Sequence, residues 1–190
     1  MVYEEAERAT AGQLKSSFYR EALEESAAFR ESYPRRRTVI TAEEMPWEDS
    51  PQGRIKHMVN EKMNTKEHCL DIYQQFLAPG SRSGKHRHLT EEVLYILEGK
   101  GYDLHWDVKF DCQDAYIWDW ETEPKKFEWE EGDFVYIPPY CGHQHFNGDP
   151  TRPARFISVT SRIVKAMGFD WFDQLENAPE YRPGEEGGQR

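Results

Sequence analysis

The stretch that decides the fold is Gly80-Ser81-Arg82-Ser83-Gly84-Lys85-His86-Arg87-His88-Leu89-Thr90-Glu91-Glu92-Val93-Leu94-Tyr95-Ile96-Leu97-Glu98-Gly99. It begins with a glycine-containing turn and ends in an apolar run. Alternate residues of a β-strand face the same side of the sheet, so His86 and His88 would project together. Glu92 follows after a short turn, at the start of the next apolar segment, where its side chain can face both histidines.

A second stretch supplies a fourth candidate ligand. The run from Gly132 to Pro139 precedes His143, which begins a further predicted strand. Imidazole and carboxylate groups are ligands that iron, manganese, nickel and zinc accept. We therefore predict one divalent metal ion per chain, with open positions for other ligands. The alternative is that these residues are ordinary polar groups on a solvated face. The predicted metal ligands are His86, His88, Glu92 and His143.

The two stretches together resemble the cupin superfamily. The first cupin motif is matched at every gap in its spacing, and the second is matched with one departure. The matching residues are Gly80, His86, His88, Glu92 and Gly99 in the first motif, and Gly132, Pro138, His143 and Asn147 in the second. The resemblance covers roughly residues 54–160. It implies an all-β fold, a cupin-type β-barrel (a double-stranded β-helix, or jelly roll) with a metal ion inside.

The departure is Tyr140, which stands where the second motif has glycine. A tyrosine lacks the easy access of glycine to positive φ, so we expect either a reshaped loop or a turn taken over by Gly142. Tyr140, Gln144 and His145 are the candidate catalytic residues, as substrate contacts. For His145, a place behind the metal ligands or at the rim is an equal alternative. The histidines without motif context, expected to be structural or exposed, are His57, His68 and His105.

Three parts are expected along the chain: an N-terminal helical arm over residues 1–37, the β-barrel over residues 38–160, and a C-terminal helix and tail over residues 161–190. The arm and the segment from Ile163 to Leu175 have apolar residues near the helical period, and Gly168 is a site at which the second helix could be interrupted. The middle part has short β-branched and aromatic runs between turn residues, which is typical of strands. The expected strands cover residues 38–41, 54–60, 70–78, 84–88, 93–98, 102–108, 116–120, 125–129, 134–137, 143–147 and 154–160.

The composition of the 190-residue chain limits the classes of partner that it can bind. A formal net charge of −11 leaves no basic surface for nucleic acid. We expect no signal peptide and no membrane span, since the apolar runs are too short. Three widely spaced cysteines suit reduced thiols in a cytoplasm. Residues 100–131, rich in aromatic side chains, suggest an added hairpin that caps the barrel or forms a dimer face. With the helical arm, this makes a homodimer the expected assembly.

The predicted site and its sequence context indicate the class of reaction. Several segments are similar to the gentisate dioxygenase-like cupins, among them Met45-Pro46-Trp47, although those enzymes generally have two barrels and this chain has room for one. The similarity implies a non-haem Fe(II) dioxygenase acting, with dioxygen, on a phenolic or otherwise enolisable small molecule. Manganese, nickel or zinc are the alternative ions. A cupin lyase or isomerase that uses no oxygen, and a non-catalytic cupin that binds a small ligand, are the other functions. Of the cations that could pair with a substrate carboxylate, Arg54 and Arg155 are favoured over Arg82, Lys85 and Arg87.

Overall fold

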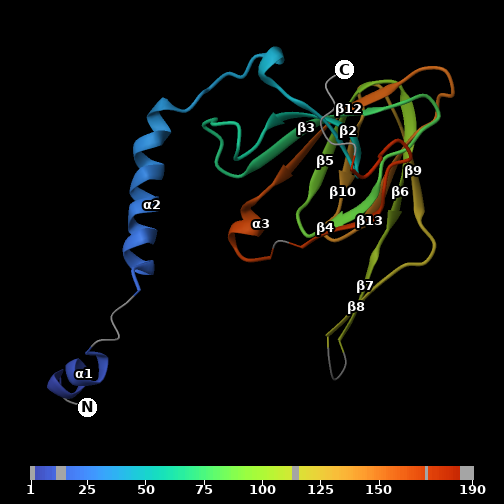
Figure 1. Cartoon of the computed structure of the whole chain (residues 1–190). Coiled ribbons are helices and arrows are strands. Elements are labelled where there is room, and N and C mark those ends of the chain that lie inside the picture. The colour runs from blue at the N-terminus through green and yellow to red at the C-terminus, as the bar shows by residue number, and fades with distance from the viewer. Residues whose placement is uncertain (1–2, 12–15, 113–115, 170, 185–190) are drawn as a thin grey trace. The chain divides into compact units, whose positions relative to one another are not determined.

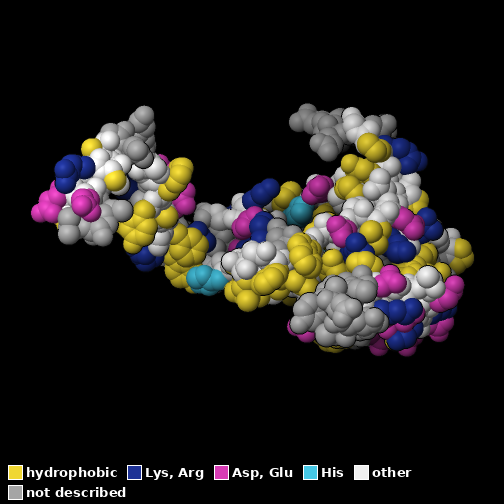
Figure 2. All heavy atoms as spheres, turned by 90° about the horizontal axis from the view of Figure 1, so that it is seen from below, with side chains coloured by type: hydrophobic (Ala, Val, Ile, Leu, Met, Phe, Trp, Pro, Cys, Tyr) yellow, Lys and Arg dark blue, Asp and Glu magenta, His cyan; other side chains and the backbone are white. Residues whose placement is uncertain are grey.

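The computed structural model describes residues 3–11, 16–112, 116–169 and 171–184. The chain forms two compact units, residues 1–37 and residues 38–190. The first unit contains helices α1 (Tyr3–Thr10) and α2 (Phe18–Ser32), followed by the short 3-10 helix η1 (Tyr33–Arg35). The predicted helical arm is therefore present as two helices. None of the α2 side chains is buried, and Phe18, Tyr19 and Leu23 are exposed, so Figure 2 shows apolar side chains at the surface of this unit.

The second unit is built from antiparallel strands arranged in two main sheets (Figure 1). A short 3-10 helix, η2 (Ala42–Glu44), precedes the first strand. The strands of the six-stranded sheet, in spatial order, are β1 (Trp47–Ser50), β2 (Gly53–Val59), β3 (Leu70–Leu77), β12 (Ala154–Ser161), β5 (Glu92–Glu98) and β10 (Phe134–Ile137). Those of the five-stranded sheet are β13 (Phe172–Glu176), β4 (Lys85–His88), β11 (Gly142–Asn147), β6 (Lys100–Trp106) and β9 (Lys125–Glu130).

The core lies between the two sheets and follows from the alternation of side chains along each strand. On β5, Leu94 and Ile96 face inward with Glu92, and on β12 Phe156 faces inward. Such alternation places one face of each strand in the interior. The buried apolar cluster consists of Leu77, Leu94, Ile96, Trp129, Val135, Ile137, Cys141, Ala154 and Phe156. This cluster fills one part of the interior, and polar side chains fill another. The all-β cupin-type fold is thereby confirmed.

The C-terminal helix is shorter than we expected. Helix α3 spans only Ile163–Ala166, and Gly168 follows with φ of +86°. The chain then forms strand β13, which pairs with β4 from Phe172 opposite His88 onward. A strand at an open sheet edge has backbone N–H and C=O groups without hydrogen-bond partners. The pairing of β13 with β4 provides partners for these groups on both strands. The prediction of a helix through Leu175 is therefore wrong, since strand pairing overrides the local apolar pattern.

The remaining strands agree with the sequence pattern except before β2 and around residue 107. Residues 38–41 are not a strand, whereas β1 was not expected. The segment predicted over residues 102–108 divides into β6 and β7 (Val108–Cys112). Strand β7 pairs with β8 (Tyr116–Trp120) in a separate two-stranded sheet, which is the added hairpin. Among the described residues, no helix has the length and apolar character that crossing a membrane requires.

Candidate metal centre

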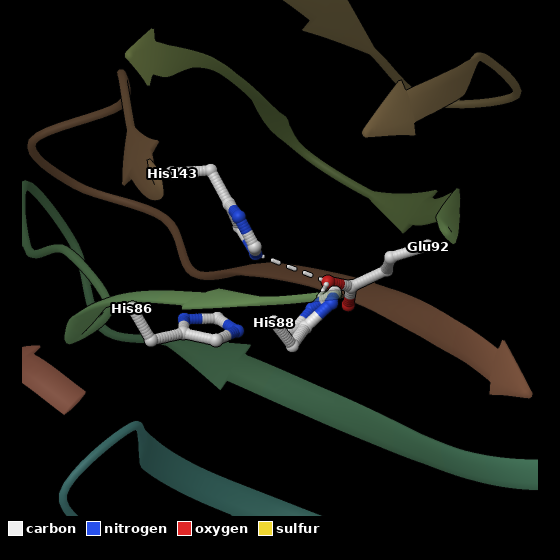
Figure 3. A group of neighbouring side chains, drawn as sticks. All are labelled: His86, His88, Glu92 and His143. Atoms are coloured by element: carbon white, nitrogen blue, oxygen red, sulfur yellow. Dashed lines mark hydrogen bonds and ion pairs between the residues drawn. The ribbon is translucent and has the colours of Figure 1, made fainter. Parts of the chain in front are cut away.

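Strands from both sheets bring the four predicted metal ligands together. His86 and His88 lie on β4 and face inward, because the burial of this strand alternates. His143, on the neighbouring strand β11, is the register partner of His86. Glu92 comes from β5 in the opposite sheet. Figure 3 shows the three imidazoles and the carboxylate converging on one point. One ligand atom from each residue lies within 4.8 Å of those of the others, and all four residues are buried.

One carboxylate oxygen of Glu92 is the centre of these contacts. Oε2 lies 3.0 Å from Nε2 of His88 and 3.1 Å from Nε2 of His143. The other ring nitrogens face backbone carbonyls: Nδ1 of His88 donates to the carbonyl oxygen of Thr90, and Nδ1 of His143 donates to that of Cys141. We assign these protons to Nδ1 because a carbonyl oxygen only accepts. In a neutral ring, Nε2 then presents a lone pair to the interior.

The protonation of the site follows from its burial. Burial lowers the pKa of His86 well below its usual value, and the neighbouring His143 lowers it further. Burial also lowers the pKa of His143, against the opposing effect of Glu92. For Glu92, burial acts to raise the pKa, but the contacts with His143 and His88 hold it well below the usual value. For His88, the contact with Glu92 outweighs burial and raises the pKa. Neutral imidazoles and an ionised carboxylate are the forms that bind a metal ion.

These residues fit a divalent metal ion. A neutral His143 directs a lone pair at the Glu92 carboxylate, and two acceptors in contact repel each other unless a cation lies between them. The buried Nδ1 of His86 has no hydrogen-bond partner among the described residues. Two donor atoms that bind one ion at about 2.1 Å and at a right angle lie about 3.0 Å apart. The distances of 3.0 and 3.1 Å match this spacing. The group could therefore hold one metal ion, with His86, His88, Glu92 and His143 as its ligands.

A cavity of about 780 Å³ extends from this group, and His86 and His88 form part of its wall. Aromatic and apolar side chains form much of the rest, among them Trp171 and Phe172 from the C-terminal segment. The ring of Phe172 stacks on that of His88, with the ring centroids 6.2 Å apart and the planes at 6°. A volume in this range, lined by both apolar and polar side chains, suits a small organic molecule.

Two residues that sequence reasoning missed hold the other oxygen of Glu92. The Tyr73 hydroxyl donates to Oε1 at 3.2 Å, and the Ser158 hydroxyl donates to the same atom. Tyr73 also lines the cavity. These residues lie 19 and 66 positions from Glu92, so no local motif connects them with it.

A second missed feature is an imidazole–carboxylate pair in the cavity wall. Nε2 of His57 lies 2.6 Å from Oε2 of Glu48, and the side chain of His57 is 28% exposed. Nδ1 of the same ring lies 3.4 Å from the Asn60 amide nitrogen. His57, Glu48 and Asn60 all line the cavity. His57 is also the register partner of Tyr73 on the next strand, so both side chains project from the same face of the sheet. The expectation that His57 is merely structural or exposed overlooks this position.

The predicted substrate contacts lie outside the cavity wall. Tyr140 takes φ of +64° itself, so the loop keeps the backbone conformation of the motif glycine without help from Gly142. Its ring packs between Trp120 and Trp171, with centroids 5.3 and 5.7 Å away. The Gln144 amide donates to the backbone carbonyl of Ser83. A role of Tyr140 and Gln144 in substrate binding stays a prediction.

His145 lies on the same strand as His143 and is fully buried against Phe156 and a second carboxylate. Its Nδ1 is 3.0 Å from Oδ2 of Asp103, and Nε1 of Trp129 donates to Oδ1. Burial acts to lower the pKa of His145, but Asp103 outweighs burial and raises it. For Asp103, the contact with His145 outweighs burial and lowers the pKa. The role of His145 as a substrate contact likewise stays a prediction.

The favoured cations are paired outside the cavity. Arg54 binds Asp49 at 2.8 Å, and Arg155 binds Glu98 at 2.6 Å. Arg162, which sequence reasoning did not single out, does line the cavity, but its guanidinium binds carboxylates of the protein. Those carboxylates are Glu67 at 2.8 Å and Asp71 at 2.6 Å. Among the described residues, neither favoured arginine reaches the cavity wall.

Several solved structures are similar to this chain. Oxalate decarboxylase from Bacillus subtilis has a TM-score of 0.50 and 18% identity, over 70% of this chain and 30% of its own. A cupin-like protein from Thermotoga maritima has a TM-score of 0.46 and 18% identity, over 65% of this chain and 76% of its own. Salicylate 1,2-dioxygenase from Pseudoaminobacter salicylatoxidans has a TM-score of 0.49 and 14% identity, over 68% of this chain and 31% of its own. This chain thus spans less than a third of the decarboxylase, and that likeness speaks for the fold alone.

The sequence comparisons are more specific for the family. No curated protein matches the chain. A family model described as auxin binding protein matches residues 35–175, which is more than half of the chain and includes the whole metal-ligand group. With the barrel and both motifs in place, the chain belongs to the auxin binding protein family, a family of the cupin superfamily.

Proposed function

We propose that this protein is a metal-dependent cupin enzyme, and specifically a non-haem Fe(II) dioxygenase that acts on a phenolic or otherwise enolisable small molecule. One observation carries the proposal: a buried group of three imidazoles and one carboxylate adjoins a cavity of about 780 Å³, and two of the imidazoles form part of its wall. Neutral imidazoles leave a divalent ion electrophilic, so an anionic substrate oxygen can bind to it. When bound, Fe(II) would supply a site at which such a substrate and dioxygen meet.

The chain's own residues have distinct roles in this proposal. His86, His88, Glu92 and His143 hold the ion. Trp171 and Phe172 give the cavity an aromatic wall, against which a planar ring can stack. His57, oriented by Glu48, is placed to accept the proton of a substrate hydroxyl.

Purification without oxygen, followed by elemental analysis, tests the proposal. We expect iron at about one ion per chain, as four ligands for one ion imply. Oxygen consumption should then appear with a member of a panel of catechols, gentisate-like acids and β-diketones. Turnover that persists without oxygen would instead support a lyase or isomerase, for which manganese, nickel or zinc would suffice. Protein that carries no metal and acquires none on reconstitution would refute the proposal.

A second candidate is a non-catalytic cupin that binds a small ligand. The family's description as auxin binding protein favours it. The two functions differ in one measurement, because a binding protein would take up the panel compounds without converting them. Calorimetric titration of the metal-loaded protein, followed by product analysis of the same samples, separates them.

The homodimer and the cytoplasmic location belong to the same proposal. Exposed apolar side chains on α2, such as Phe18 and Leu23, support association through the arm. Light scattering of the full chain and of a chain that begins at Thr38 would show whether residues 1–37 are required. A monomeric full chain would contradict the homodimer.

A further inference from the structure

The two oxygens of the Glu92 carboxylate have different partners. Oε2 faces His88 and His143, at 3.0 and 3.1 Å. Oε1 faces away from them and accepts hydrogen bonds from the hydroxyls of Tyr73 and Ser158. A carboxylate oxygen has about two acceptor positions, so two donors occupy those of Oε1.

The three residues come from three adjacent strands of the six-stranded sheet. Tyr73 on β3 is the register partner of Ser158 on β12, so their side chains project from the same face. Strand β12 also pairs with β5, on which Glu92 lies. Both Glu92 and Ser158 are fully buried. The contacts are therefore fixed by strand pairing and not by a mobile loop.

We propose that Tyr73 and Ser158 are positioning residues that hold Oε1 of Glu92, so that only Oε2 faces the metal ion. This inference rests on the proposed function, because it assumes that the ligand group binds a metal. A carboxylate that binds through one oxygen occupies one position on the ion, whereas one that binds through both occupies two. The two hydroxyls therefore keep a position available for a ligand that enters from the cavity.

The chemistry of the two donors agrees with this role. The Tyr73 phenol carries a hydroxyl proton that it can donate. A serine hydroxyl also keeps its proton. Both groups can therefore donate to the carboxylate whether or not the ion is bound, and their partner in each case is the oxygen that faces away from the imidazoles.

Metal affinity of two variants tests the proposal. In Tyr73→Phe and Ser158→Ala, the affinity for Co(II), measured by competition with a chromophoric chelator, should fall about 10- to 100-fold. The visible absorption of bound Co(II) should also change, because Glu92 is free to rotate. Tyr136→Phe is the matched control, since the Tyr136 hydroxyl donates to Oε1 of Glu91 at 2.8 Å, one residue away. Ser161→Ala removes a cavity-lining hydroxyl from the same strand as Ser158. Both controls should bind Co(II) like the wild type.

A double-mutant cycle shows whether Tyr73 acts through Glu92. In a Glu92→Ala background, the further change Tyr73→Phe should leave the Co(II) affinity unchanged. If Tyr73→Phe lowers the Co(II) affinity equally with and without Glu92, the proposal is overturned. Wild-type Co(II) affinity and an unchanged absorption spectrum in both single variants would also overturn it. Thermal unfolding of the metal-free proteins identifies a variant that fails to fold. If Tyr73→Phe does not fold, the same cycle is measured with Ser158→Ala.

Failure of this inference is distinguishable from failure of the proposed function. Wild-type protein that binds no Co(II), zinc or iron would refute both. Wild-type protein that binds the ion, with variants that bind it equally well, would refute only the role of Tyr73 and Ser158.

Discussion

His86 on β4 is the register partner of His143 on β11, and their imidazole centroids lie 4.1 Å apart. The two residues are 57 positions apart in the sequence. Strand pairing in one sheet therefore brings together side chains from the two motifs, and the opposite sheet adds Glu92. Because this pairing depends on backbone hydrogen bonds, the strands themselves set the relative positions of the two imidazoles.

Replacement of a metal ligand should abolish metal binding without unfolding the barrel. In His86→Ala and His143→Ala we expect metal affinity to fall by more than the roughly 10- to 100-fold that loss of an outer partner costs. Elemental analysis after reconstitution measures this loss. His68→Ala is the control, since His68 is an exposed histidine. Full metal content in both ligand variants would contradict the assignment.

Much of the barrel was predictable because strand alternation and turn residues are local signals. His86 and His88 lie two apart on one strand, and Glu92 follows after a turn, so their convergence could be inferred from spacing. His143 was a candidate from its residue type and its place at the start of a predicted strand, and the resemblance to a known motif supported it. Its register opposite His86 could not be derived, because register between distant strands is not a local property. The structure confirms that these four residues lie together.

The missed features depend on tertiary pairing. Ser158 and Tyr73 meet Glu92 only because three strands are adjacent in the sheet, and neither residue has a motif around it. Strand β13 escaped prediction because its apolar residues also fit a helical pattern. This segment forms a strand and not a helix because it pairs with β4 at the edge of the sheet. Which strand lies at an edge cannot be read directly from a single sequence. His57 became a candidate only when β2 placed it beside the cavity.

The Glu48–His57 pair should affect turnover and not metal content. If His57 accepts a substrate proton, His57→Gln should lower kcat by about 10²- to 10⁴-fold while the protein keeps its ion. Glu48→Gln should have a smaller effect, because the imidazole remains but loses its charged partner. Steady-state kinetics on whichever panel compound the wild type converts, with metal analysis of the same samples, gives both quantities. Unchanged kcat in His57→Gln would refute the proposed role.

Tyr140 offers a measurement of backbone strain. Its φ of +64° costs a non-glycine residue about 1–2 kcal/mol, whereas glycine adopts this conformation freely. Tyr140→Ala removes the packing on Trp120 and Trp171 but keeps the strain, and Tyr140→Gly removes both. Allowing for the greater entropy of unfolded glycine, the glycine variant should be more stable than the alanine variant by about 1 kcal/mol. Urea unfolding measures the difference, and an alanine variant of equal or greater stability would contradict it.

Asp149 should give the protein a pH-dependent stability that is independent of the metal centre. Its Oδ1 accepts hydrogen bonds from the backbone nitrogen and the hydroxyl of Thr151, and from the backbone nitrogen of Arg152. The hydrogen bonds from Thr151, and then those from Arg152, lower the pKa of Asp149. Because the folded pKa lies below that of the unfolded chain, the ionised carboxylate stabilises the fold above about pH 4, and this contribution is lost as the pH falls through the folded value.

Asp149→Asn tests this sign, because an amide keeps an oxygen acceptor but carries no charge. The free energy of unfolding should be lower in Asp149→Asn than in the wild type near pH 7, and the difference should shrink as the pH falls below about 4. Urea titrations of the metal-free proteins at several pH values measure it, since contributions of the imidazole ligands are common to both and cancel. Thr151→Val, which removes one donor but keeps the carboxylate, should show an intermediate loss at neutral pH. A difference that grows on acidification would mean that the charge of Asp149 does not stabilise this loop.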